Sequence, residues 1–152
     1  MSLIRLDRVS KSFPAPSRGR RGGADVLAVD DVSLEIAEGS ITGIIGYSGA
    51  GKSTVLRLVN ALEKPTAGRV EIDGVDITGF GERRLRGLRS QIGMIFQQFN
   101  LFDSRTVAGN VAYPLEVAGT PRAEITARVA ELLQFVGLAD KAKAHPEQLS
   151  GG

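Results

Sequence analysis

Hydrophobic and polar residues alternate along three stretches of the chain and run together along two others. The alternating stretches are residues 3–9, 32–36 and 69–73. A period of two residues is typical of a strand with one buried face, so each stretch is predicted to be a strand. The continuous apolar runs are residues 41–45 and 92–96. Such runs are typical of strands buried on both faces, so we predict a parallel strand at 41–45 and a second buried strand at 92–96.

Apolar positions recur at helical spacing after the first continuous run. Residues 52–62 carry one apolar face, formed by Val55, Leu56, Leu58, Val59 and Leu62. This spacing predicts a helix. The strongly basic stretch 82–90 is predicted to be a short helix or a turn.

Two further helices are predicted in the second half of the chain. The first follows Thr106, and Pro114 is expected to kink or end it, because proline lacks an N–H group and clashes with the preceding turn. The second begins with Thr120 as its N-cap and Pro121 as its first helical residue. Gly137 is expected to end it.

A glycine-rich segment joins the first apolar run to the first helix. It fits the phosphate-loop pattern G-x-x-x-x-G-K-[ST] and consists of Gly46, Tyr47, Ser48, Gly49, Ala50, Gly51, Lys52, Ser53 and Thr54. The expected context, a strand before the loop and a helix after it, predicts a nucleotide-binding site in an α/β domain.

The residue types of this loop suit phosphate chemistry. Gly49 and Gly51 allow successive backbone N–H groups to point inward and form an anion nest. The helix that starts near Lys52 directs its free N–H groups and positive dipole end to the same place. Lys52 is expected to reach the β- and γ-phosphates, and the Ser53 hydroxyl to ligate Mg²⁺.

Composition narrows the possible classes of protein. The chain has 152 residues, of which 42% are hydrophobic and 24% charged, as is ordinary for a globular domain. The net charge of +2 is nearly balanced, so nothing indicates a nucleic-acid partner. The absence of cysteine excludes disulfides and cysteine metal sites. No apolar run approaches the roughly 20 residues of a membrane helix, so any membrane role is expected to come through a partner.

Four other segments allow more than one interpretation. Phe13 fits either a core position or a stacking face for a base, and Gln97 fits either a ligand-facing amide or an ordinary amide at a strand end. Residues 14–24 form a Pro/Gly/Arg-rich loop, which is either a solvated insertion or a contact for lipid headgroups or phosphate. The final segment 149–152, Leu-Ser-Gly-Gly, is a weak indication of another phosphate-binding turn.

Taken together, these pieces resemble the ATP-binding subunit of ABC transporters. GYSGAGKST, the glutamine that ends IGMIFQ, and LSGG occur in that family's order and spacing over essentially the whole chain. Within the family, the runs IIGYSGAGKST, IGMIFQQFNLFDSRTVAGNVAYPLEVAGTP and VAELLQFVGLADKA are most similar to the ATPases of methionine importers. The loop at residues 14–24 is longer and richer in arginine than that subfamily leads us to expect.

The resemblance implies a role for particular residues. Phe13 matches the aromatic residue that stacks on adenine, and Lys52 and Ser53 match the phosphate-loop lysine and the Mg²⁺ ligand. Gln97 matches the glutamine that contacts Mg²⁺ and the attacking water. The signature motif, which contacts the γ-phosphate bound by the opposite subunit, is matched by Ser150, Gly151 and Gly152. That arrangement implies a two-fold dimer with two ATP molecules at its interface.

The resemblance also implies an architecture and a cellular role. The expected fold is α/β, a P-loop NTPase core with N-terminal antiparallel strands and a partial helical subdomain. Residues 1–98 match the N-terminal part of the ATP-binding core, and residues 99–152 the helical subdomain that ends at the signature motif. The family works with integral-membrane permease subunits and, indirectly, an extracytoplasmic substrate-binding protein. We therefore expect a peripheral ATPase on the cytoplasmic face of the inner membrane that drives amino-acid uptake, with methionine as the expected substrate.

Some family features have no match in this sequence. They are the Asp-Glu pair that follows a later strand, the switch histidine, and the C-terminal regulatory domain. Phosphoryl transfer depends on positioning and charge stabilisation. We therefore expect the chain to be a fragment that holds a nucleotide site without hydrolysing ATP alone.

Several alternatives remain open from the residues. Asp76-Ile77-Thr78-Gly79 matches the D-x-x-G of GTPase switches, although Asn-Lys-x-Asp, which would select guanine, does not occur. A soluble ABC protein without a membrane partner, an importer ATPase for another amino acid and a non-functional remnant are the others.

Overall fold

The structure, a computed structural model, describes residues 2–15, 24–98 and 100–149. It divides into two compact units, Met1–Met94 (unit 1) and Ile95–Gly152 (unit 2). Each unit is described by itself. The arginines of the loop at 14–24 and the signature-motif residues Ser150, Gly151 and Gly152 lie outside the described residues.

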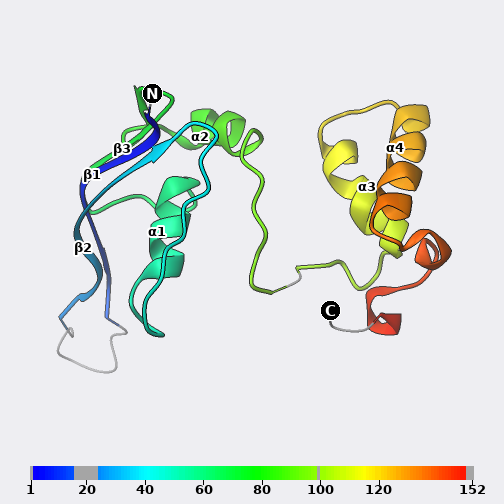
Figure 1. The fold of residues 1–152 in the computed structure, drawn as a ribbon, viewed down its shortest axis with the longest axis horizontal. Coiled ribbons are helices and arrows are strands. Elements are labelled where there is room, and N and C mark those ends of the chain that lie inside the picture. The colour runs from blue at the N-terminus through cyan, green and yellow to red at the C-terminus, as the bar shows by residue number, and fades with distance from the viewer. Residues whose placement is uncertain (1, 16–23, 99, 150–152) are drawn as a thin grey trace. The chain divides into compact units, whose positions relative to one another are not determined.

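Unit 1 is built on an antiparallel sheet (Figure 1). Its strands are β1 (Ser2–Phe13), β2 (Val26–Ala37), β3 (Ala67–Ile72) and the short β4 (Val75–Asp76), in the order β2-β1-β3-β4. The three strands predicted from alternating residues are confirmed within β1, β2 and β3. Only the end of the third differs, because Asp73 leaves the strand at a positive φ of 50° and begins the turn to β4.

Two helices complete the core of unit 1. They are α1 (Lys52–Val59) and α2 (Glu82–Arg89), so the basic stretch at 82–90 is a helix. The core contains residues of the sheet, of both helices and of the segments that follow α1 and β4: Leu6, Val9, Val29, Val55, Leu58, Ala61, Val70, Ile77 and Leu85. Each fully buried leucine contributes about 1.5–3 kcal/mol of stability through burial alone.

The strands predicted for the two continuous apolar runs are not formed. Residues 41–45 and 92–96 are irregular, and Ile41, Ile45 and Ile95 are fully exposed. A strand needs a neighbour to satisfy its backbone N–H and C=O groups, and neither run is paired with a strand in the described part of the chain. The division between the two units also falls inside the second run. The prediction was therefore wrong because it used apolar content without evidence of a partner strand.

Unit 2 is helical. It contains α3 (Val107–Val117) and α4 (Arg122–Phe135), followed by the 3₁₀ turns η1 (Ala139–Lys141) and η2 (Pro146–Gln148). α3 and α4 lie against each other (Figure 1), with a small core of Val107, Ala112, Val129 and Leu133.

Helix ends differ from the predictions by a few residues. α1 ends at Val59 instead of residue 62, because Ala61 adopts a left-handed φ of 56°. Pro114 lies inside α3 and does not end it, since the helix continues to Val117. Pro121 is the N-cap of α4 instead of its first residue, so Thr120 is not the cap. Gly137 follows α4 with a φ of 72°, as its predicted role requires.

Candidate nucleotide-binding site

The phosphate loop leads directly into α1. Gly51 is the N-cap of that helix and has a left-handed φ of 83°. A Cβ atom at this position would collide with the carbonyl oxygen of Ala28 in β2. Only glycine therefore combines this backbone conformation with so close an approach to the sheet. The pattern predicted a glycine here for its flexibility, and the contact with β2 adds a second reason.

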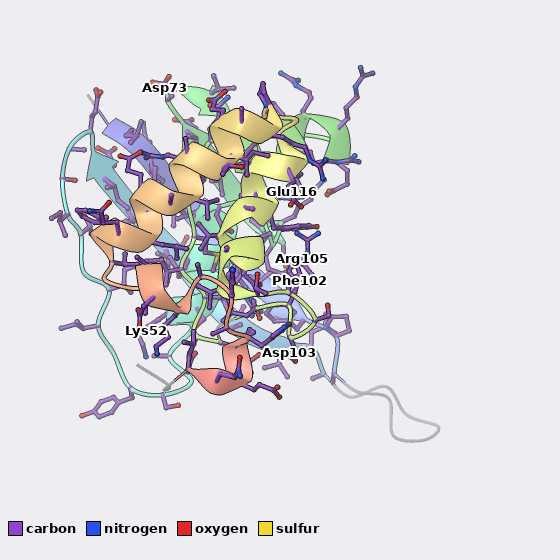
Figure 2. The ribbon with its side chains drawn as sticks, turned by 90° about the vertical axis from the view of Figure 1, so that its right-hand side faces the viewer. Lys52, Asp73, Phe102, Asp103, Arg105 and Glu116 are labelled. Atoms are coloured by element: carbon purple, nitrogen blue, oxygen red, sulfur yellow. The ribbon has the colours of Figure 1, made fainter. Side chains whose placement is uncertain are left out.

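Lys52, the first residue of α1, folds back over the loop. Its ammonium group donates hydrogen bonds to the carbonyl oxygens of Gly46, at 2.8 Å, and Tyr47, at 2.7 Å. The N–H of Ala50 also donates to the oxygen of Tyr47, at 3.1 Å. Lys52 is labelled in Figure 2. The lysine thus lies with its charge inside the curve of the loop, where a phosphate group would bind.

The start of α1 has the electrostatics of an anion site. The first N–H groups of a helix have no partner within the helix. No described side chain caps them, and the first turn of α1 contains no acidic residue. The positive end of the helix dipole is therefore not neutralised locally. Ser48, Gly49, Ala50 and Ser53 are exposed around this end, so a nucleotide can reach the N–H groups.

The Ser53 hydroxyl is the side-chain oxygen of this loop that is predicted to bind a magnesium ion. No group of three or more histidine, cysteine or acidic residues that could hold a metal occurs in the ranges that the structure describes. Mg²⁺ is commonly bound by few protein ligands together with substrate phosphates. The residues present therefore fit a metal that arrives with the nucleotide.

Phe13 lies at the same end of the sheet as the phosphate loop. It is the last residue of β1 and pairs with Val26 of β2. Ala28, two residues further along β2, is the residue that Gly51 approaches. The Phe13 side chain is partly buried and keeps some exposed surface. This position is compatible with stacking on a base whose phosphates lie at α1.

Two other predicted parts of the site belong to unit 2, which is described by itself. Gln97 is exposed at a bend in unit 2, whereas the phosphate loop belongs to unit 1. Its roles toward Mg²⁺ and water stay predictions, as do the roles of Ser150, Gly151 and Gly152.

The D-x-x-G segment has a structural explanation. The Asp76 carboxylate accepts a hydrogen bond from the N–H of Thr78 at 2.9 Å, and the Thr78 oxygen accepts one from the N–H of Val70 at 2.9 Å. Hydrogen bonds from the Thr78 side chain and then its backbone lower the pKa of Asp76. These residues shape the turn after β4, which accounts for the match to the GTPase pattern.

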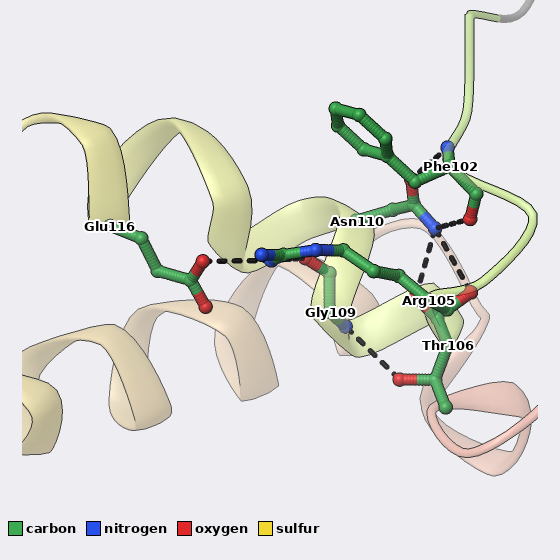
Figure 3. A network of polar contacts seen from close by, with 6 residues as sticks. All are labelled: Phe102, Arg105, Thr106, Gly109, Asn110 and Glu116. Carbon is green, nitrogen blue, oxygen red and sulfur yellow. Dashed lines mark hydrogen bonds and ion pairs between the residues drawn. The ribbon is translucent and has the colours of Figure 1, made fainter.

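A polar network holds the segment that leads into α3 (Figure 3). The Asn110 amide donates to the carbonyl oxygens of Phe102, Arg105 and Thr106 at 3.1, 3.2 and 3.0 Å. Its oxygen accepts from the N–H of Phe102 at 2.8 Å. The Thr106 hydroxyl caps α3 by accepting from the N–H of Gly109 at 3.1 Å. One side chain on the first turns of α3 therefore fixes the preceding loop.

Arg105 joins this network to an aromatic pair. It forms an ion pair with Glu116 at 2.7 Å and lies 5.0 Å from the ring centre of Tyr113. The rings of Phe102 and Tyr113 meet edge to face at 4.7 Å. Figure 2 shows Phe102, Arg105 and Glu116 along one side of unit 2. Sequence reasoning missed both Arg105 and Asn110, although an asparagine four residues after Thr106, where a helix was predicted to begin, was the available signal.

Known proteins match the chain over almost its whole length. A family model described as ABC transporter matches residues 29–152. The chain belongs to the ABC transporter family. The phosphate loop, Gln97 and the final Leu-Ser-Gly-Gly all fall within the matched range.

Two relatives carry names that refer to methionine import. The chain is 61% identical to "Methionine import ATP-binding protein MetN 2" of Rhodococcus jostii (strain RHA1), over 99% of this chain and 42% of the relative. It is 62% identical to "Methionine import ATP-binding protein MetN" of Nocardia farcinica (strain IFM 10152), over 98% and 43%. The chain thus spans less than half the length of these relatives.

Solved structures of the family share the fold. A dimeric post-hydrolysis state of the ATP-binding cassette MJ0796 bound to ADP and Pi matches with a TM-score of 0.85 and 35% identity, over 97% of this chain and 63% of that chain. A dimeric structure of MJ0796 described as a bacterial ABC transporter cassette has the same TM-score. The α/β fold of an ABC ATPase, predicted from the motifs, is therefore confirmed. None of the helices in the described ranges has the length and apolar character needed to span a bilayer.

Proposed function

We propose that this chain provides the nucleotide-binding part of an ABC importer ATPase, which couples ATP binding and hydrolysis to methionine uptake across the cytoplasmic membrane. The observation that carries the proposal is the phosphate loop, where the Lys52 ammonium is held inside the loop at the positive end of α1. The choice of methionine rests on the 61% identity to a methionine import protein.

ATP and Mg²⁺ are the cofactors of the proposed function, and the phosphate loop supports them. Phosphates would bind to the N–H groups of the loop and to Lys52, and Ser53 would supply one oxygen to Mg²⁺. Adenine would stack on Phe13. Bound Mg²⁺ would neutralise charge on the phosphates, and Gln97 would contact the metal and the attacking water during hydrolysis.

The proposed partners are a second copy of the ATPase subunit, permease subunits and a binding protein, and membership of the ABC transporter family supports them. The ATPase subunit would form a two-fold dimer in which Ser150, Gly151 and Gly152 of one copy contact the nucleotide bound by the other. It would lie on the cytoplasmic face of the inner membrane against permease subunits, which receive substrate from an extracytoplasmic binding protein. ATP would favour the closed dimer and hydrolysis would release it, so that the permease changes conformation with the nucleotide state.

Nucleotide binding is tested by thermal unfolding of this chain with and without MgATP. A ligand at one hundred times its Kd stabilises a folded protein by about 2.7 kcal/mol. We expect Lys52→Ala to remove this stabilisation and Lys143→Ala, at an exposed lysine in unit 2, to retain it. Unchanged stabilisation of Lys52→Ala would refute the phosphate-loop assignment. A preference for GTP over ATP would favour a GTPase instead.

Transport is tested with the full-length gene in a bacterial strain deficient in methionine import. Uptake of labelled methionine should depend on the wild-type gene and be lost with Lys52→Ala. Uptake of a different amino acid in its place would correct the substrate. Normal methionine uptake by the Lys52→Ala strain would contradict the proposed role.

A further inference from the structure

Lys11, in β1, is held by three contacts. Its ammonium group lies 2.9 Å from a carboxylate oxygen of Glu63 and 2.9 Å from the carbonyl oxygen of Lys64, to which it donates a hydrogen bond. It also lies 4.9 Å from the centre of the Phe13 ring. Only 14% of the Lys11 side chain is exposed. A lysine so constrained differs from an ordinary surface lysine, whose ammonium group is hydrated and free to move.

The residues that hold Lys11 belong to the turn that follows α1. The N–H of Glu63 donates to the carbonyl oxygen of Arg57 in α1, at 3.0 Å. Thr66, at the end of the turn, donates its N–H to the oxygen of Ser10 at 2.8 Å and accepts from the N–H of Ser12 at 3.0 Å. The turn is thus joined to the last part of β1 on one side and to α1 on the other.

We propose that Lys11 is a positioning residue for the nucleotide base. It fixes the Phe13 ring and connects it, through Glu63 and the turn, to the helix whose other end carries the phosphate loop. This inference rests on the proposed function, in which Phe13 stacks on adenine while the phosphates bind at Lys52. The distance between those two binding elements then depends on the contacts of Lys11.

The cation also changes the ring as a stacking partner. A positive charge over one face of an aromatic ring is attracted by the electrons of that face. The base would stack on the opposite face, where the polarised ring is a better partner for an electron-rich purine. Because Lys11 already lies beside the ring before any nucleotide binds, only the part of this interaction that changes on binding affects affinity. We therefore expect loss of the charge to weaken ATP binding by no more than about thirtyfold, which is the equivalent of a full cation–π contact of about 2 kcal/mol. The available signal in the sequence was a lysine two residues before an aromatic residue, and therefore on the same face of a strand.

The test measures the contribution of the base to binding separately from that of the phosphates. Binding of MgATP and of inorganic tripolyphosphate with Mg²⁺ is measured by calorimetry for wild type and Lys11→Met, in which a methionine of similar length carries no charge. We expect weaker binding of ATP and unchanged binding of tripolyphosphate. Lys11→Arg should restore part of the ATP affinity, because arginine also places a cation over a ring. Lys143→Met, at an exposed lysine of unit 2, is the matched control and should bind both ligands as wild type does.

Other results would overturn the inference. Equal losses for both ligands would mean that Lys11 only maintains the fold, and an unchanged ATP affinity would mean that it has no role in binding. Glu63→Gln, which removes the carboxylate that holds Lys11, should reproduce the same selective loss if Lys11→Met does not fold. Phe13→Ala distinguishes a wrong role for Lys11 from a wrong proposed function. If Phe13→Ala weakens ATP binding while Lys11→Met does not, the base stacks on Phe13 without help from Lys11. If wild type binds ATP no better than tripolyphosphate, the stacking itself is refuted.

Discussion

The strand β1 and the segment at residues 41–45 belong to the same unit but differ in secondary structure and burial. β1 lies between β2 and β3, and its Leu6 and Val9 are buried in the core. Residues 41–45 are more apolar, yet Ile41 and Ile45 are fully exposed and only Ile44 is partly buried. The segment with the weaker hydrophobic pattern is the strand, and the segment with the stronger pattern is a loop.

The difference teaches that backbone pairing decides which apolar segment becomes a strand. β1 satisfies its N–H and C=O groups on both edges through its neighbours. The segment at 41–45 has no strand beside it among the described residues. Hydrophobicity favours burial of the side chains. However, burying an extended backbone without hydrogen bonds costs more free energy than the burial of these apolar side chains contributes.

The largest expected effect on stability comes from a comparison of a buried core residue with an exposed residue of the segment at 41–45. Leu58, on α1, is 1% exposed, whereas Ile45 is 95% exposed. Leu58→Ala should lower the free energy of unfolding by about 2–5 kcal/mol, because it leaves a cavity in the core of unit 1. Ile45→Ala should change it by no more than about 0.5 kcal/mol. Urea unfolding followed by circular dichroism compares the two, since the chain has no tryptophan. A comparable loss from Ile45→Ala would show that the run is packed in solution.

The sequence predicted elements where the local pattern is sufficient. The alternation in β1, β2 and β3 and the amphipathic spacing of α1 and α4 depend on residues close in the chain. The phosphate loop was identified because its glycines and Lys52 form a local motif. The features that the sequence did not predict correctly depend on residues that are far apart in the chain. They are the lack of a neighbouring strand at 41–45, the contact of Gly51 with Ala28, and the ion pair of Lys11 with Glu63. No periodicity within a segment contains that information.

The second prediction concerns the point where the loop touches the sheet. Gly51 and Gly49 have nearly the same φ, 83° and 82°, but only Gly51 approaches the backbone of β2. A left-handed residue other than glycine costs about 1–2 kcal/mol. Gly49→Ala should cost this amount, and Gly51→Ala should cost more, because its Cβ would also collide with Ala28.

Thermal unfolding and MgATP binding of these two variants provide the check. Gly51→Ala is expected to lose ATP binding as well as stability, since the start of α1 must move away from β2. Equal effects of the two substitutions would mean that the loop is not held against the sheet.

A third prediction tests a loop that is held by a side chain instead of a strand. The segment before α3 is irregular, as residues 41–45 are, but Asn110 forms four hydrogen bonds with it. Asn110→Ala should cost about 1–3 kcal/mol, because backbone groups of the loop lose their partners. Thr126→Ala, on an exposed position of α4, should change stability by less than about 0.5 kcal/mol. Hydrogen exchange at residues 102–106 reports the loop directly, and unchanged protection in Asn110→Ala would contradict the role of this side chain.

The smallest effect is expected at the edge of the sheet, where Asp76 shapes the turn after β4. Hydrogen bonds from Thr78 lower the pKa of Asp76 in the folded state below its ordinary value of 3.8. Its contribution to stability is therefore fully present above that ordinary value and is lost as the pH falls through the lower folded-state pKa. Because Asp76 is exposed, the contribution is small. The free energy of unfolding of Asp76→Asn should fall below that of wild type at about pH 6, and the difference should shrink on acidification toward about pH 2. Thr78→Val removes the hydroxyl group that donates to this carboxylate, so part of the same pH dependence should disappear in that variant. A difference that stays constant from pH 6 to pH 2 would mean that the carboxylate charge does not stabilise the turn.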